Sequence, residues 1–255
     1  MKSILLATAA LALLAGSALA QDVVRVGIAA EPYPPFAAPD AAGNWVGWEV
    51  EIIGAVCAAA ALSCEITPTA WDGIIPALTS GRIDAIMASK SITEERMQTI
   101  DFSDKYYNTP TVIVGQRGMA TDASPEALAG KILGVQVSTV HQAYAQGYFE
   151  GETELRSYQT QDEANQDLTA GRIDATQADS IAMDAFLATE AGACCEVWGT
   201  VADDPAILGS DIGVGLRKGE DDLRAAFNTG IAAILANGTY DEITSRYFES
   251  SIYGG

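Results

Sequence analysis

Residues 86–104 (IMASKSITEERMQTIDFSD) gather hydroxyl groups, backbone N–H groups and a guanidinium at the end of an apolar run. Residues 85–87 predict a buried strand, and Ser91 and Glu94 have capping-box spacing, which predicts that a helix begins at Ser91. Arg96 would then lie in the first turns of that helix. Helix N-termini bind anions, and a guanidinium pairs with a planar carboxylate through two hydrogen bonds. The stretch therefore favours a carboxylate-binding site. The alternative is an ordinary strand-to-helix turn with a solvated arginine.

An internal repeat supplies a second half for such a site. The sequence LTSGRIDA at residues 78–85 recurs as LTAGRIDA at residues 168–175, an offset of 90 residues. Each copy combines a helix end, a glycine and a strand, and at the same offset Ser89 corresponds to Asp179. Ligands of open α/β sheets bind at the carboxyl ends of strands. Two similar lobes that face each other would therefore hold a ligand between Ser89 and Asp179. The alternative is that this helix–glycine–strand sequence pattern is common and recurs by chance.

Strands and helices alternate along the chain, which predicts an α/β fold with mostly parallel sheets. Two helix starts have clear caps: Ser124 followed by Pro125, and a capping box at Thr160 and Glu163. The predicted strands cover residues 23–28, 45–48, 65–67, 83–87, 132–137, 154–158, 173–178 and 213–216. The predicted helices include residues 49–62, 74–80, 180–189, 221–237 and 240–248, with others starting near 91, 125, 138 and 161.

The N-terminus and the overall charge predict an exported protein. Lys2, the apolar residues 4–14 and the small residues 18–20 have the pattern of a signal peptide cleaved near Ala20. No later run is long and apolar enough to span a membrane. The formal net charge of −20 argues against nucleic acid and anionic membranes as partners. We also expect no metal and no cofactor, because there is no CxxC pair and only one histidine, His141.

Four cysteines in an exported chain suggest disulfide bonds. Cys57 and Cys64 lie seven positions apart and could join a helix end to the following strand. Closing so short a loop would contribute roughly 2–3 kcal/mol. Cys194 and Cys195 are adjacent, and the sequence leaves open whether they pair.

Four segments resemble the bacterial periplasmic amino-acid-binding proteins of ABC transporters, solute-binding protein family 3. The similarity is to the branch that binds lysine, arginine and ornithine, histidine, or opines, and it covers essentially the whole mature chain. The resemblance implies two lobes, joined by a two-segment hinge, that close over one amino acid and then dock on a membrane permease. The lobes would comprise residues 21–107 with 209–255, and residues 108–208. The segments are WVGWEVEIIGAVC, WDGIIPALTSGRIDAIMASKSITEERMQTIDFSDKYY, YQTQDEANQDLTAGRIDATQAD and GVGLRKGEDDL.

The resemblance also implies roles for individual residues. Arg96 would bind the α-carboxylate of the ligand, a role that its bidentate geometry suits, with backbone groups at Thr139 and Val140. Ser91 and Asp179 would receive the α-ammonium group. Ser89 would make a further polar contact with the ligand. Tyr33 and Trp71 would form aromatic walls on either side of the ligand side chain. Cys57 and Cys64 would form the disulfide bond of the family.

Several positions depart from the family pattern and bear on ligand specificity. Val140 replaces a second hydroxyl, so only its N–H remains. Lys90 stands where an apolar residue is usual; it either points away from the site, the orientation we favour, or supplies a cation inside it. Glu31 lies near the acid that meets cationic side chains in binders of basic amino acids. His141 matches a polar position near the ligand, and the alternative is a histidine on a wet helix face.

We expect a binding protein rather than an enzyme, because the sequence shows no GxSxG elbow and no phosphate-binding loop. One alternative is a dehydratase-type periplasmic enzyme on the same fold, for which Glu31 or His141 would be the general acid. Another is a sensor module for a signalling receptor. The expected partners are a free amino acid and a membrane ABC permease, and the protein itself is expected to be a periplasmic monomer.

Overall fold

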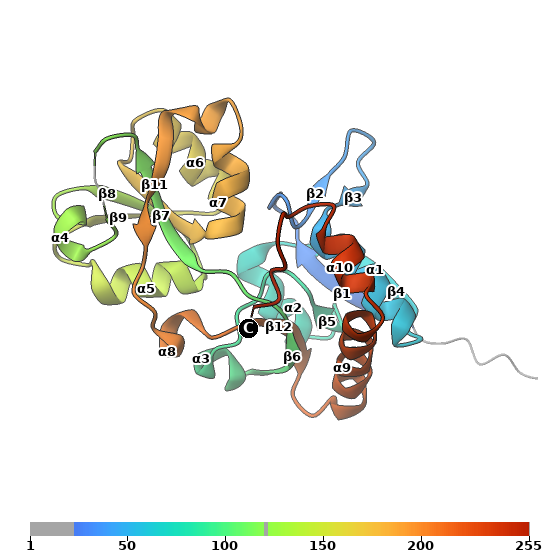
Figure 1. The fold of residues 1–255 in the computed structure, drawn as a ribbon. Coiled ribbons are helices and arrows are strands. Elements are labelled where there is room, and N and C mark those ends of the chain that lie inside the picture. The colour runs from blue at the N-terminus through green and yellow to red at the C-terminus, as the bar shows by residue number, and fades with distance from the viewer. Residues whose placement is uncertain (1–22, 120–121, 255) are drawn as a thin grey trace, which may run out of the picture.

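Two five-stranded sheets organise the chain, and each forms the centre of one lobe (Figure 1). The computed structural model describes residues 23–119 and 122–254, so the predicted signal peptide lies outside the described residues. The first sheet has the order β4-β1-β5-β12-β6. Its strands are β1 (Val24–Ala29), β4 (Cys64–Thr69), β5 (Ala85–Ile86), β6 (Ile100–Tyr107) and β12 (Ile212–Arg217). The second sheet has the order β11-β7-β10-β8-β9, and β2 (Ala38–Pro39) pairs separately with β3 (Trp45–Val46). Its strands are β7 (Thr111–Gln116), β8 (Ile132–Gln136), β9 (Glu154–Tyr158), β10 (Ala175–Asp179) and β11 (Cys195–Thr200).

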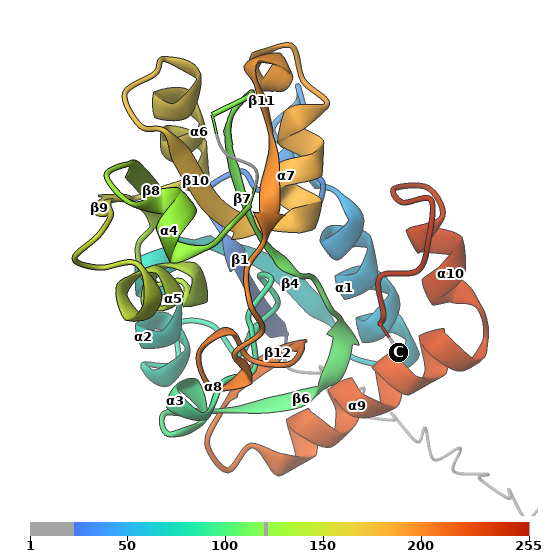
Figure 2. The same cartoon turned by 60° about the vertical axis from the view of Figure 1, so that its left-hand side comes forward.

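The chain crosses between the lobes twice, after β6 and before β12 (Figure 2). The two crossing segments touch, since the Asn108 side chain donates a hydrogen bond to the carbonyl of Ser210. Strands β7 and β12 each follow a crossing and enter their sheet antiparallel to their neighbours. Strand β1 is parallel to its neighbours β4 and β5. Strand β8 is parallel to its neighbours β9 and β10. The predicted α/β fold with two sheet-bearing lobes is confirmed, and the sheets are mixed rather than mostly parallel.

Helices cover both faces of each sheet, and the apolar side chains of the central strands are therefore buried. In the first lobe Trp48, Ile52 and Phe227 pack on one face, and Ile74 and Leu78 pack on the other. The helices of this lobe are α1 (Trp48–Ala59), the 3-10 turn η1 (Trp71–Gly73), α2 (Ile74–Thr79), α3 (Glu94–Met97), α9 (Asp221–Ala236) and α10 (Thr239–Thr244). The second lobe and the return crossing contain α4 (Pro125–Leu128), α5 (Val140–Tyr148), α6 (Gln161–Thr169), α7 (Ser180–Leu187), the 3-10 turn η2 (Ala191–Cys194) and α8 (Pro205–Leu208). No helix in the described ranges has both the length and the apolar character that a membrane span requires.

The internal repeat has the same structural role in both lobes. Gly81 and Gly171 end α2 and α6 with φ angles of 76° and 67°. The aspartate three residues later accepts a hydrogen bond from the first part of the neighbouring strand. Asp84 accepts from the backbone N–H of Arg25 at 3.0 Å, and Asp174 accepts from that of Ile132 at 2.7 Å. The repeat therefore reflects two equivalent helix–strand units.

Local structure differs from the prediction at the start of α3. Thr93, not Ser91, is the N-cap, and its hydroxyl accepts a hydrogen bond from the backbone N–H of Arg96 at 3.2 Å. Ser91 is instead held by an isolated bridge to Ile212, a partner far along the chain. Trp48, predicted at the end of a strand, is the first residue of α1. The caps at Ser124 and Thr160 are confirmed.

Cys57 and Cys64 form a disulfide bond that joins the last turns of α1 to the start of β4, as predicted. Replacing both cysteines with serine should lower the free energy of unfolding by about 2–3 kcal/mol, because the unfolded chain regains the entropy of a short closed loop. Urea denaturation measures this change. An unfolding free energy within about 0.5 kcal/mol of the native value would contradict the expectation.

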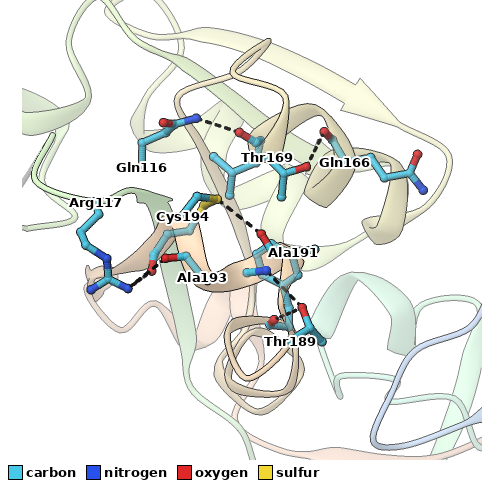
Figure 3. The surroundings of a disulfide bond; sticks show 12 residues. Gln116, Arg117, Gln166, Thr169, Thr189, Ala191, Ala193 and Cys194 are labelled. Atoms are coloured by element: carbon cyan, nitrogen blue, oxygen red, sulfur yellow. Dashed lines mark hydrogen bonds between the residues drawn. A yellow bond between two sulfur atoms is a disulfide. The ribbon is translucent and has the colours of Figure 1, made fainter.

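Cys194 and Cys195 also pair with each other, at the junction between η2 and β11 (Figure 3). The Arg117 side chain lies beside them and donates hydrogen bonds to the carbonyls of Ala193 and Cys195, at 3.5 Å and 2.8 Å. Substituting both of these cysteines is the matched control for the first pair. Adjacent residues enclose almost no loop, so a smaller loss of stability is expected.

Candidate functional site

A cavity between the two lobes collects most of the residues singled out in the sequence. It has about 680 Å3 of empty space, part of which is open to solvent. We call it the cleft cavity. It is lined by Ala29, Glu31, Pro32, Tyr33, Ala37, Glu49, Trp71, Ala88, Ser89, Ser91 and Arg96 from the first lobe, and by Gln136, Thr139, Val140, His141, Gln161 and Asp179 from the second.

Arg96 supplies positive charge on the side of the first lobe. Its side chain donates a hydrogen bond to the carbonyl of Ser91 at 2.9 Å, which fixes the guanidinium next to the end of β5. Burial lowers its pKa to about 10, and the acids Glu95 and Asp179 oppose that shift, so Arg96 remains cationic at neutral pH. A guanidinium held in this way can accept a planar carboxylate as a second partner.

The N-terminus of α5 faces the cleft cavity from the second lobe. Thr139 is its N-cap: the hydroxyl accepts from the backbone N–H of Gln142 at 3.0 Å and donates to the carbonyl of Gln136 at 2.7 Å. That hydroxyl is therefore used within the protein. The free N–H groups of the first helical turn, including that of Val140, add partial positive charge near Arg96.

Asp179 supplies negative charge at the end of β10. The Tyr33 hydroxyl donates to its Oδ2 at 2.7 Å, and Nε2 of His141 lies 3.5 Å from its Oδ1. Nδ1 of His141 is 3.3 Å from the hydroxyl of Thr111, and both His141 and Asp179 are buried. Burial and the neighbouring Asp179 raise the pKa of Tyr33 well above its usual range, so its hydroxyl stays protonated. His141 is therefore part of a buried polar cluster rather than on a wet helix face.

Among the described residues, two hydrogen bonds link the lobes across the cleft cavity. One is the bond from Tyr33 to Asp179, and the other runs from the indole N–H of Trp71 to the carbonyl of Val137 at 3.1 Å. Glu31 orients Trp71, because its carboxylate accepts the backbone N–H of Trp71 at 3.2 and 3.3 Å. The predicted aromatic residues and Glu31 thus lie at one place, and Phe36 stacks behind Tyr33 at a ring distance of 5.8 Å.

The two serines before α3 differ in their surroundings, and Lys90 between them points elsewhere. Ser89 has a φ of 53°, and its buried hydroxyl has no hydrogen-bond partner within residues 23–119 and 122–254. Ser89 also lines the cleft cavity, so its unpartnered hydroxyl is a candidate contact for a ligand. Lys90 is not among the residues that line the cleft cavity; it lines a neighbouring cavity, in agreement with the favoured orientation.

Glu49 is the main cavity residue that the sequence analysis missed. It is only 2% exposed, and its Oε1 accepts hydrogen bonds from the Tyr106 hydroxyl at 2.5 Å and the Ser89 backbone N–H at 2.8 Å. These contacts hold Ser89 in its left-handed conformation. The one available signal was an acidic residue between Trp48 and Val50 at the start of an apolar helix. The sequence analysis also missed Gln136 and Gln161. Gln136 is the last residue of β8 and Gln161 the first residue of α6, and the sequence pattern there indicates only an ordinary strand end and helix start.

Burial raises the pKa of Glu49 to about 7, although its hydrogen bonds from Tyr106 and Ser89 act in the opposite direction. The folded protein therefore keeps a proton that the unfolded chain releases near the usual value of 4.5. The contribution of Glu49 to stability is full below pH 4.5 and is lost as the pH rises to about 7. At about 1.4 kcal/mol per pKa unit, the loss is about 3 kcal/mol.

Glu49→Gln should remove this dependence. The unfolding free energy of the native protein, relative to that of the variant, should fall by about 3 kcal/mol between pH 4.5 and pH 7.5. Urea denaturation at several pH values measures it, and parallel profiles would contradict the assignment. Glu51→Gln is the control on the same helix: hydrogen bonds from Tyr247 and Arg246 lower the pKa of Glu51, so its contribution is lost as the pH falls.

The chain is similar to proteins that bind solutes outside the bacterial cytoplasm. Residues 24–250 match the family model of the bacterial extracellular solute-binding proteins, family 3. The L-arginine-binding protein of Pseudomonas aeruginosa is 39% identical over 99% of this chain and 98% of its own length. The lysine/arginine/ornithine-binding periplasmic protein of Escherichia coli is 34% identical over 91% of this chain and 90% of its own.

The fold is also similar to that of solved proteins. The structure of an ancestral arginine-binding protein bound to arginine superposes with a TM-score of 0.81 at 31% identity. The match covers 89% of this chain and 98% of the ancestral protein.

Proposed function

The chain belongs to the bacterial extracellular solute-binding proteins of family 3, and on this premise we propose that it captures one free α-amino acid in the cleft cavity. The separation of charge in that cavity carries the proposal. Arg96 and the N-terminus of α5 form a positive pole, and Asp179 with Tyr33 forms a negative pole. A free α-amino acid carries a carboxylate and an ammonium group on one carbon, and so matches both poles at once.

The α-carboxylate would pair with the Arg96 guanidinium and accept from the backbone N–H groups at Thr139 and Val140. The α-ammonium would donate to the Asp179 carboxylate and to Ser91. The Asp179 carboxylate has acceptor capacity beyond its bond from Tyr33, because an ionised carboxylate accepts about four hydrogen bonds.

The side chain of the ligand would lie between Tyr33 and Trp71, with Ser89 as a polar contact. Flat aromatic walls suit a long side chain, either apolar along its stem or ending in a planar group. Glu31 lines the same region and favours a polar or basic end group. The names of the two relatives, which bind arginine or lysine, arginine and ornithine, agree with this class.

We propose that the ligand leaves unchanged. Of the two candidate general acids for a dehydratase-type reaction, Glu31 accepts the backbone N–H of Trp71, and His141 contacts Asp179 and Thr111, so both are engaged with groups of the protein. Proton NMR spectra of the free amino acid, recorded before it is added to the protein and again after its release, should be identical. New resonances would identify an enzyme.

Residues 21–107 with 209–255 and residues 108–208 would be the two moving units, with the segments around Asn108 and Ser210 as the hinge. The closed form would deliver the amino acid to a membrane ABC permease. Export to the periplasm with cleavage near Ala20, and a monomeric state, complete the proposal. Adding ligand should reduce the radius of gyration measured by solution scattering, and an identical profile at saturation would contradict hinge closure.

A thermal-shift screen over the amino acids tests the proposed function. The protein is first unfolded and refolded so that any ligand carried through purification is removed. A ligand bound only by the folded state raises the melting temperature, by an amount that grows with its concentration. At least one polar or basic L-amino acid should do so. If no amino acid shifts the melting temperature at millimolar concentration, amino-acid capture is wrong.

A further inference from the structure

Lys90 is a buried cation without an acidic partner. It is 2% exposed, and its ammonium lies 3.8 Å from the centroid of the Trp71 ring. Within residues 23–119 and 122–254 the ammonium group forms no ion pair or hydrogen bond. A buried lysine is usually paired with a carboxylate. Here the aromatic face of Trp71 takes that place, through a cation–π contact.

Trp71 separates two cavities, and Lys90 belongs to only one of them. The second, which we call the rear cavity, is lined by Trp71, Lys90, Arg96, residues 72, 75, 93 and 95, and residues of α5 and α8. Trp71 and Arg96 line both cavities, whereas Lys90 lines only the rear cavity. The ammonium group therefore occupies the face of the indole turned away from the cleft cavity, and the opposite face remains for the ligand.

A cationic ligand side chain stacked on the front face would have Lys90 on the other side of the same ring. Two cations on opposite faces of one indole lie less than about 10 Å apart, within a Debye length at ordinary salt. The two cations compete for the same ring quadrupole. They also repel each other across the Trp71 ring, which screens charge less than water does. A neutral side chain of the same shape has no such repulsion. Glu31 attracts a cation from the front, so the two residues act in opposite directions.

We propose, on the basis of the amino-acid capture proposed above, that Lys90 is a specificity-determining residue that acts through Trp71. It disfavours a cationic ligand side chain relative to a neutral one of the same shape. The preference of this protein is thereby shifted from basic toward uncharged long polar amino acids.

The charge of Lys90 responds to pH. Burial and the neighbouring Arg96 lower the pKa of its ammonium group well below the usual range. Asp72 from η1, and Glu95 and Arg96 from α3, are the charged groups that line the rear cavity with it, and α5 contributes only neutral side chains there. Because deprotonation removes the opposing charge, discrimination against a cationic side chain should weaken as the pH rises.

L-Arginine and L-citrulline form the matched probe pair, because a guanidinium and a urea group have the same shape and differ in charge. Calorimetric titration at pH 6 and low salt gives the ratio of their dissociation constants. In Lys90→Met this ratio (arginine over citrulline) should fall about tenfold, while the Kd of citrulline changes less than about threefold. The control is Lys131→Met, whose ammonium lies 5.7 Å from the Trp198 ring in the second lobe and outside both cavities. It should leave the ratio unchanged.

The pH series keeps the inference testable on the native protein, should Lys90→Met fail to fold. The native ratio should fall as the pH rises, and in Lys90→Met it should stay flat across the same series. An unchanged ratio in Lys90→Met at pH 6 would overturn the inference, as would equal weakening of both probes, which would mean that Lys90 only supports Trp71. If neither probe binds the native protein the inference also fails, and the amino-acid screen then decides separately whether amino-acid capture fails with it.

Discussion

Arg96→Ala is expected to weaken binding of the captured amino acid more than a hundredfold. The substitution leaves a carboxylate in a water-poor cleft without its charged partner, and breaking a buried ion pair from one side costs about 3–5 kcal/mol. Arg96 is suited to this role because its guanidinium is already fixed by the carbonyl of Ser91 and remains cationic despite its lowered pKa. Calorimetric titration with the amino acid that gives the largest thermal shift measures the loss.

Arg82→Ala is the matched control, because Arg82 is an exposed arginine of the same lobe and lines neither cavity. It should leave the dissociation constant unchanged. The melting temperature without ligand should be similar in both variants, so that lost binding is not mistaken for unfolding. A loss below threefold in Arg96→Ala would remove Arg96 from the site.

Asp179→Asn should weaken binding by about 30-fold to 1,000-fold, the equivalent of about 2–4 kcal/mol. The amide keeps the shape of the side chain and can still accept the hydrogen bond from Tyr33, but it no longer balances the α-ammonium charge. Because the Tyr33 bond joins the two lobes, the variant separates the charge of Asp179 from its role in closure. The same calorimetric titration applies.

Asp184→Asn is the control for this second pole. Asp184 is an exposed residue on α7, the helix that begins directly after Asp179. Its substitution removes the same charge from the same lobe at a greater distance from the cleft cavity. If both variants weaken binding equally, the effect of Asp179 is general electrostatics rather than a direct contact.

Local rules predicted much of the fold. The alternation of strands and helices, the caps at Ser124 and Thr160, and the repeat around Asp84 and Asp174 depend on residues close together in the chain. Strand direction in the sheets did not follow from them, because β7 and β12 enter their sheets after crossing between lobes. Ser91 has capping-box spacing, but it forms a β-bridge with Ile212 instead. Thr93 is therefore the N-cap of α3.

The candidate site was predictable where residue type and strand ends coincide, as at Arg96 and Asp179. The candidate site was not predictable where the direction of a side chain decides whether a residue lines the cavity. Glu49 enters the cleft cavity because α1 packs with one acidic residue facing the end of β5, where Ser89 needs a partner for its N–H. Lys90 lies outside the lining of the cleft cavity because the neighbouring Ser89 has a left-handed backbone and the Trp71 ring offers the ammonium group a cation–π partner.

The two-pole geometry of the cleft cavity is tested most directly with three ligands. These are the amino acid with the largest thermal shift, the amine that lacks its α-carboxylate, and the acid that lacks its α-amino group. We predict that the intact amino acid binds one-to-one and that each analogue binds at least about a hundredfold more weakly, because each leaves one buried pole unpaired. Binding of either analogue within threefold of the amino acid, measured by calorimetric titration, would contradict capture by both poles.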